Sequence, residues 1–441
     1  MNKVTLSFIL LVAAGTVFLL PNFYGNKWNA VEAEYYEEWQ IRYDRLVIAR
    51  LARTQQNGFF SDGGLLGLGD ADEWNFLSAT HAHQFDVYFR NGDFQNYLIY
   101  KSNPGFQGLL YGTIDKLLNI PNEQKIQVYR GITATASALT FGIIFAFIAA
   151  EFGVIAGVLT LIFSAFSIWT VLPAGSIFWN FWAFYIPLVA CTYLLAKSVG
   201  KGMDLSAGIY IVLFTVTLLR ILLSGFDLMT SGLIMTTVPI VYYGIFAGWK
   251  PKIFIERFIK ISIALLAATA AGLLIMSIQI ASVDDTVTNV VSYIADRFGH
   301  HFAGNSEYYT SGGIEATKIG GIEITSIYLA MPAVNVPWPG ADLQVSYWHL
   351  ILLFAFFTIL YLVAAKNRIS DPGKANALII ATWYSLSAPL SWILLFRPHS
   401  IIHTHVNTMG WQMPFTLLGF TLCGFVITEL FKKNRLITLS P

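Results

Sequence analysis

Carboxylates that could accept a proton are concentrated just after the first apolar segment. Glu34 and Glu38 lie in the run 32–51, where aromatic and aliphatic residues recur every three or four positions and predict a helix. Side chains four residues apart share one helical face. A carboxylate beside an acceptor hydroxyl can act as a general base. Glu34 and Glu38 are therefore the first candidates for a catalytic base, with Asp44 in reserve; the alternative is a solvated acidic helix end.

A second chemical group lies near the other end of the chain, at 397–412. His399 and His403 are four residues apart, which stacks them on one helical face close to Arg397. Such a group could donate hydrogen bonds to a phosphate or supply two ligands to a divalent metal, with His405 as a weaker metal or acceptor candidate. A polar interfacial turn without chemistry is the third interpretation, because the spacing fixes no third metal ligand.

Two further candidates are an arginine in an apolar run and an acidic group in a glycine-rich loop. Arg220 interrupts Leu-Leu-Arg-Ile-Leu-Leu, where a charge costs at least about 2.5–3.5 kcal/mol on insertion. It could bind a lipid phosphate or extend its guanidinium to the nearby interface. Asp70, Asp72 and Glu73 resemble part of a calcium loop without its twelve-residue ligand pattern, so they are weak candidates for a metal or acceptor site.

The composition places these side chains in a membrane protein. Of the 441 residues, 55% are hydrophobic and 12% are charged, whereas soluble domains carry roughly 25% charged residues. This excludes a soluble enzyme and a disordered scaffold. A net charge of +1 provides no overall field that would attract a nucleic acid. The two cysteines lie in apolar runs, which predicts neither a disulfide framework nor a zinc site.

Apolar stretches approaching the roughly 20 residues of a transmembrane helix recur along the chain. There are ten: 4–20, 132–150, 154–172, 178–196, 207–223, 228–248, 261–281, 350–365, 375–396 and 413–430. We expect the first to be retained, because no clear cleavage site precedes Pro21. With Lys3 inside, every short basic loop falls on the cytoplasmic side, as do both termini. The expected fold is an all-α polytopic membrane protein of about ten transmembrane helices.

Three long segments then face the external side: 21–131, 282–349 and 397–412. All eight histidines lie in or beside them. The single integral membrane domain thus comprises 1–281 with seven spans, the second external loop 282–349, and 350–441 with three spans. We expect the first external loop to contain helices that lie in the bilayer interface. In the second loop, the tandem repeat 312–327 alternates apolar and polar residues and predicts a short β-hairpin; a lid over a site is the alternative.

These features resemble the GT-C superfamily of membrane-embedded glycosyltransferases. The shared pattern is a cytoplasmic N-terminus, a large first external loop with an acidic residue soon after the first span, and later arginines and histidines near the external surface. Many members carry Asp or Asp-Glu where this chain has four glutamates in the run 32–39. The other matching positions are Arg42, Tyr43, Arg50, Arg220, Arg397, His399 and His403.

The resemblance implies that a sugar moves from a polyprenyl-phosphate donor to a hydroxyl of a glycan, lipid or protein acceptor, with inversion. A glutamate or Asp44 would accept the proton, and Arg220 with the 397–403 group would hold the leaving phosphate. The bound partners would be the lipid-linked donor, the acceptor and membrane lipid, without nucleic acid. No cofactor is implied for certain, although a divalent metal could take part. A compact chain without organelle signals favours the bacterial inner membrane, with the active site facing the periplasm.

Two other functions fit parts of the sequence. His399-Ser400 followed by Gly410 nearly repeats the external motif of O-antigen ligases and polymerases, although Met413 stands where that family usually has Gly, Thr or Tyr. A membrane transporter is the alternative from another class. It would show repeated halves and several charges near the midplane, whereas the sequence offers Arg220 and no convincing internal repeat.

Overall fold

The computed structural model describes residues 3–71, 78–200, 205–284, 319–338, 341–365 and 371–437, together with a few residues between 290 and 299. Within these ranges, eight helices are long and apolar enough to cross a membrane. A ninth span is formed if the bent pair of helices 154–165 and 168–174 is counted as one. The chain is therefore a polytopic, mainly helical membrane protein, which confirms the predicted class.

The described part of the chain consists of helices of very different lengths and two pairs of short strands. In order they are α1 (Lys3–Gly25), α2 (Ala33–Asn57), η1 (Ser61–Gly64), β1 (Leu66–Gly69), α3 (Ser78–Phe89), β2 (Tyr97–Tyr100), α4 (Phe106–Leu117), α5 (Asn122–Phe152), α6 (Val154–Ala165), α7 (Ile168–Ala174), α8 (Phe181–Gly200), α9 (Ala207–Ser224), α10 (Met229–Phe246), α11 (Pro251–Asp284), α13 (Gly321–Ala330), β3 (Pro332–Trp338), β4 (Ala341–Ser346), α14 (Tyr347–Leu360), η4 (Tyr361–Ala365), α15 (Pro372–Ser385), α16 (Ser387–Leu395), α17 (Arg397–Ile402), α18 (Thr404–Asn407), η5 (Thr408–Gln412) and α19 (Phe415–Ile437).

Each of the ten predicted apolar stretches overlaps a helix, but two of them differ from a simple span. The stretch 154–172 is broken into α6 and α7, which meet at an angle of 69°. Ser167 has an extended backbone at the break and begins the second helix. The stretch 350–365 forms α14 and η4, which are too short to count among the eight candidate spans.

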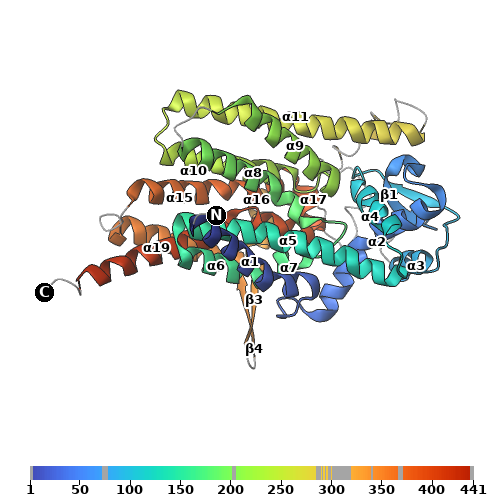
Figure 1. The fold of residues 1–441 in the computed structure, drawn as a ribbon, viewed down its shortest axis with the longest axis horizontal. Helices are drawn as coiled ribbons and strands as arrows, with labels where there is room; N and C mark the ends of the chain where they lie inside the picture. Colours follow the sequence, from blue (N-terminus) through green and yellow to red (C-terminus); the bar gives the residue numbers. More distant parts are fainter. Residues whose placement is uncertain are drawn as a thin grey trace.

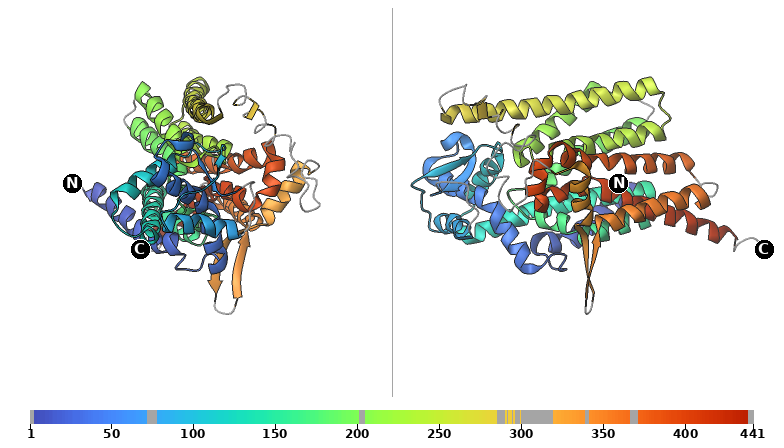
Figure 2. Two further views of the ribbon diagram at one scale, coloured as in Figure 1. Left: turned by 90° about the vertical axis from the view of Figure 1, so that its right-hand side faces the viewer. Right: turned by 180° about the vertical axis from the view of Figure 1, so that it is seen from behind.

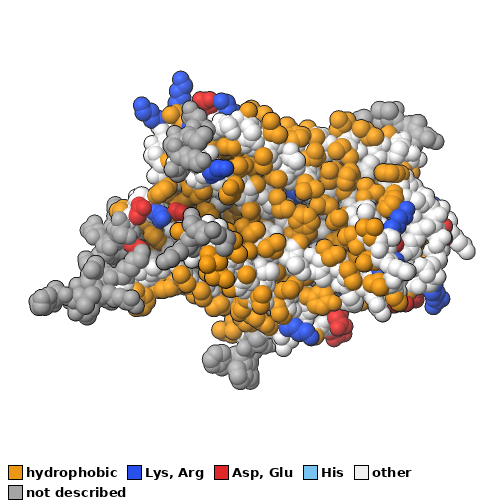
Figure 3. All heavy atoms as spheres, in the orientation of Figure 1, with side chains coloured by type: hydrophobic (Ala, Val, Ile, Leu, Met, Phe, Trp, Pro, Cys, Tyr) orange, Lys and Arg blue, Asp and Glu red, His pale blue; other side chains and the backbone are white. Residues whose placement is uncertain are grey.

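The long helices run side by side along the longest axis of the molecule, and the segment between α1 and α5 forms a cap at one end (Figure 1). The cap consists of α2, α3 and α4 around the antiparallel pair β1–β2, in which Leu66 lies opposite Tyr100. The same arrangement is seen from behind in Figure 2. On the face shown in Figure 3, hydrophobic side chains cover the middle and charged side chains gather towards the two ends. This distribution suits a bilayer around the middle of the bundle.

A buried arginine shapes the loop that follows α2. The Arg50 side chain is fully buried and donates to the carbonyl oxygens of Ser61 at 2.7 Å and Phe59 at 2.6 Å. α4 crosses directly over it, because a Cβ at Gly108 would come 2.6 Å from Arg50 Cγ. Arg50 therefore holds the cap together, which accounts for an arginine at a position that the GT-C resemblance also marked.

A buried carboxylate joins the helices of the cap to α5. Asp115 Oδ1 accepts hydrogen bonds from Tyr88 at 2.6 Å and Tyr129 at 2.7 Å and lies 3.1 Å from Lys125 Nζ, while its Oδ2 accepts from Gln55 at 3.0 Å. Burial opposes ionisation, but the hydrogen bonds from Tyr88, Gln55, Tyr129 and Lys125 outweigh it and lower the Asp115 pKa. One side chain thus connects α2, α3, α4 and α5.

We expect Asp115→Asn to lower the free energy of unfolding by about 1–3 kcal/mol, because a buried donor loses its charged acceptor. Chemical denaturation in detergent would measure this loss. Asp86→Asn, at an exposed position of α3, is the matched control and should change stability little. Since the pKa of Asp115 is lowered in the folded protein, the stability that it supplies is present near neutral pH and is lost as the pH falls through that pKa. Equal stability of the two variants would contradict the assignment.

The predicted hairpin lies elsewhere in the second long loop. The second copy of the repeat, 320–327, falls in α13, so the hairpin prediction for these residues is wrong; residues 312–318 of the first copy lie outside the described residues. Ile324 and Tyr328, one helical turn apart, are both buried, and Tyr328 donates to the Ser400 carbonyl at 2.7 Å. Tertiary packing therefore overrides the alternating pattern. The hairpin of this loop is β3–β4, which projects from the bundle (Figure 1).

Candidate functional site

Aromatic side chains fasten α2 to the bundle. The Trp39 ring stacks against that of Trp179 with centroids 6.1 Å apart, and Tyr43 lies 5.5 Å from the same ring. Gln40 Nε2 donates to the carbonyl oxygen of Leu172 at 2.7 Å. The aromatic face that predicted an interfacial helix therefore packs against α7 and the segment that follows it. This fixes the position of the charged side chains that share α2.

Asp44, the reserve candidate for the base, is fully buried on the inner face of α2. Its Oδ2 accepts from Arg130 Nε at 2.9 Å, and its Oδ1 accepts from Ser176 Oγ at 2.7 Å. Burial raises the Asp44 pKa, while Arg130 and the hydrogen bonds act in the opposite direction. These contacts join α2 to α5 and to the segment after α7. The geometry thus gives Asp44 a positioning role, and its role as a base stays a prediction.

A double-mutant cycle on Asp44 and Arg130 should reveal this positioning role. We expect Asp44→Leu and Arg130→Met each to lower the free energy of unfolding, because each leaves its partner, the half-buried Arg130 or the buried Asp44, without its countercharge. The double variant should be more stable than the sum of the two losses predicts, with an interaction energy of about 0.5–3 kcal/mol. Chemical denaturation in detergent supplies the four values. Strictly additive losses would show that the pair does not hold α2 in place.

The first candidates for the base, Glu34 and Glu38, are both exposed on α2. Glu38 lies one turn before Arg42, and the charges of both act on the hydroxyl of Tyr35 in the same helix. Glu34 lies in the first turn of α2, farther along the helix from Arg42. Of the two glutamates, Glu38 is therefore the one beside a cation.

The charge of Arg42 influences side chains from distant parts of the chain. It acts on Arg45 in α2, on His81 in α3 and on His405 in α18. The side chain is partly exposed. Burial, and then the charges of Arg45 and Arg42, lower the pKa of His81 to about 4. Burial is the main reason why a protonated histidine is disfavoured here, and the charges of Arg45 and Arg42 add to it. These two arginines make the local potential positive, which suits an anion.

The histidines of the 397–412 segment form a row that ends beside this arginine. The ring centroids of His399 and His403 are 4.6 Å apart, and those of His403 and His405 are 5.8 Å apart. His399 is buried, whereas Arg397 is exposed at the start of α17. Among the residues that the structure describes, no group of three His, Cys, Asp or Glu side chains could hold a metal ion.

Of the weaker acidic candidates, the structure describes Asp70, which lies in the cap directly after β1. Asp70 Oδ1 accepts from the backbone N–H groups of Gln95 at 2.7 Å and Asn96 at 3.1 Å, and its Oδ2 lies 3.0 Å from His83 Nε2. These bonds fix the loop beside β2 and give Asp70 a structural role. Asp72 and Glu73 lie outside the described residues.

The Arg220 side chain binds backbone groups just after the C-terminal end of its own helix, α9. Its guanidinium donates to the carbonyl oxygens of Gly225, at 3.0 Å, and Asp227, and it lies 4.4 Å from the centre of the Phe184 ring. These contacts satisfy backbone groups that are left open where α9 ends. They place Arg220 as a support of the α9–α10 connection, and its role in phosphate binding stays a prediction.

Asp227, in that connection, is a carboxylate that the sequence analysis missed. Its charge acts on Arg220 and also on Tyr43 of α2. The signal in the sequence is an acidic residue in a short turn between two apolar stretches, three positions after Ser224, the last residue of α9. An isolated acidic residue in such a turn is usually solvated, so residue type alone does not identify Asp227 as a candidate for the site.

Comparison with known proteins finds no matching family model, no matching curated protein and no matching solved structure. The fold and the site therefore define the class directly: a polytopic helical membrane protein with a helical cap and a positively charged cluster where the cap meets the bundle.

Proposed function

We propose that this protein is a membrane glycosyltransferase that moves a sugar from a polyprenyl-phosphate donor to an acceptor hydroxyl. The observation that carries the proposal is that the charge of Arg42 on α2 acts both on His405 of α18 and on His81 of α3. A positive cluster of this kind suits a phosphate group. Carboxylates lie near it, Glu38 one turn away on α2 and Asp227 beside Tyr43.

The reaction needs a base for the hydroxyl proton and a cation for the leaving phosphate, and the proposal assigns one residue to each. The acceptor hydroxyl oxygen attacks the anomeric carbon while the bond from that carbon to the phosphate oxygen breaks, and the hydroxyl proton passes to Glu38. The leaving group is polyprenyl phosphate, and the negative charge that develops lies on its phosphate oxygens. Arg42, with His81 and His405 around it, stabilises the developing charge. Direct displacement inverts the anomeric carbon.

The other candidates take supporting roles in this proposal. Asp44 holds α2 in position through Arg130, and Arg220 supports the connection that carries Asp227. The row from His399 to His405 leads away from the cluster and supplies further donors. In this proposal the protein lies in a bacterial inner membrane with the cap on the periplasmic side. The short basic loops of the sequence predict that the opposite side is cytoplasmic.

A transfer assay with a panel of polyprenyl-phosphate sugars tests the proposal. Purified protein in vesicles should transfer sugar from at least one donor to a glycan or lipid acceptor and release polyprenyl phosphate in equal amount. Solute uptake into sealed vesicles is measured in parallel. Uptake without any sugar transfer would overturn the proposal in favour of a transporter.

A further inference from the structure

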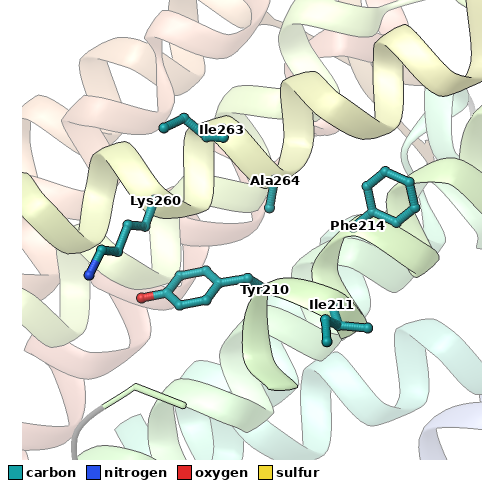
Figure 4. A pocket seen from close by; sticks show the side chains of 6 residues that line it. All are labelled: Tyr210, Ile211, Phe214, Lys260, Ile263 and Ala264. Atoms are coloured by element: carbon teal, nitrogen blue, oxygen red, sulfur yellow. The ribbon is translucent and has the colours of Figure 1, made fainter. Parts of the chain in front are cut away.

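A groove runs between α9 and α11 on the side of the bundle, away from the candidate site. Its volume is about 370 Å³, and Figure 4 shows the side chains that line it. They are Tyr210, Ile211 and Phe214 from α9 and Lys260, Ile263 and Ala264 from α11. Both helices are candidate membrane spans, so the groove opens towards lipid.

Small residues on α11 account for the groove. At Gly272 the two helices touch, because a Cβ there would come 2.6 Å from Ile221 Cγ2. Nearer the start of α11, the helix presents Ala264 to α9, and this short side chain leaves the space open. Ile263 and Ile211 stand at the edges with 59% and 65% of their surface exposed. The groove therefore has apolar walls and a shallow apolar floor.

The surface of the groove is apolar, and two polar groups lie at one end of it. The Lys260 ammonium and the Tyr210 hydroxyl point towards each other there (Figure 4), and they interact electrostatically. Lys260 Nζ also lies 2.6 Å from Glu256 Oε1, but both side chains are more than half exposed, so this pair contributes little. An ammonium group has three donors. Lys260 can therefore bind a second anion without losing its bond to Glu256.

The start of α11 is basic as a whole. Lys250, Lys252, Arg257 and Lys260 fall within eleven residues at the beginning of this candidate span. Groups of four or more basic residues next to a transmembrane helix are typical of sites for anionic lipids. Lysine and tyrosine at a membrane surface place their apolar parts in the hydrocarbon and their polar ends at the headgroups.

We propose that this groove binds an anionic phospholipid. Its phosphate lies on Lys260 and the Tyr210 hydroxyl, and one acyl chain follows Phe214 and Ala264 along the groove. The apolar walls single out a lipid over free phosphate, which has no apolar part to bury. The bound lipid holds α11 against α9. At its far end α11 contacts the cap, because Gln279 Nε2 donates to the Gly63 and Pro104 carbonyls at 3.1 and 2.8 Å.

Native mass spectrometry of the full chain with added phosphatidylglycerol tests the groove. Ala264→Phe fills the groove, and we expect it to weaken phosphatidylglycerol binding at least tenfold. Ile278→Phe, at an exposed position on the same helix, is the matched control and should bind like the wild type. Equal binding by all three proteins would overturn the proposal.

Phosphatidylcholine, whose headgroup is neutral overall, tests the polar end. The wild type should prefer phosphatidylglycerol to phosphatidylcholine, and Lys260→Gln should lose that preference while still retaining lipid. Lys197→Gln, on α8, should keep it. Because Lys260 is an exposed residue, this variant is expected to fold even if Ala264→Phe does not. A preference that survives in Lys260→Gln would overturn the assignment of the headgroup.

Discussion

Replacing Glu38 by glutamine should lower the rate of sugar transfer by about 10²- to 10⁴-fold, the usual contribution of a positioned general base. Glutamine keeps the size of the side chain but cannot accept the hydroxyl proton. Glu38 is exposed, so the substitution should leave the fold unchanged. Initial rates with a saturating polyprenyl-phosphate sugar would measure the loss, and the thermal unfolding temperature would show that the protein is intact.

Two matched variants identify the base among the nearby carboxylates. Glu34→Gln changes the same residue type on the same exposed face of α2, but one turn farther from Arg42. Asp227→Asn removes the carboxylate beside Tyr43. Both should retain more activity than Glu38→Gln. A larger loss in either variant would transfer the role of base to that residue and leave the rest of the site unchanged.

Arg42→Gln should lower transfer by about 10²- to 10³-fold, as expected when one group that stabilises developing negative charge is removed. The charge of the Arg42 guanidinium acts on both His81 and His405, so its removal takes away a positive charge that influences both histidines. Arg42→Lys should retain part of the activity, because it keeps the charge but loses the planar fork that binds two phosphate oxygens.

Arg90→Gln is the control for Arg42→Gln. Arg90 is exposed just after α3, in the same cap, and its substitution should leave the rate of transfer unchanged. Rates are measured at several donor concentrations to separate kcat from KM. If Arg42→Gln and Arg90→Gln transferred sugar equally well, the cluster around Arg42 would not be the phosphate site.

Much of the helical architecture could be predicted from hydropathy, because a span needs a long apolar run whatever its neighbours are. The departures come from tertiary contacts. The break between α6 and α7 lies within a continuously apolar stretch. Hydropathy does not indicate the backbone change at Ser167, because the residues on both sides of it are apolar. In α13, the buried pair Ile324 and Tyr328 outweighs an alternating pattern that is typical of a strand.

The candidate site was predictable as segments but not as contacts. The carboxylates of α2 and the histidines of 397–405 were found from residue type and spacing. The partners of Asp44 were not, because Arg130 and Ser176 lie 86 and 132 residues away along the chain. Arg42 was noted as a position of the family resemblance but not as a partner of the histidines, since nothing in the local sequence shows that α18 will fold back towards α2. Asp227 was missed for the same reason.

Binding of a short polyprenyl phosphate tests most directly whether α2 and α18 form one phosphate site. Farnesyl phosphate would be titrated into the purified wild type, Arg42→Gln and His405→Gln by calorimetry. Each substitution should weaken binding at least tenfold, about 1.4 kcal/mol, since both residues face the same anion. Wild-type affinity in His405→Gln together with lost affinity in Arg42→Gln would show that the two segments do not share a ligand.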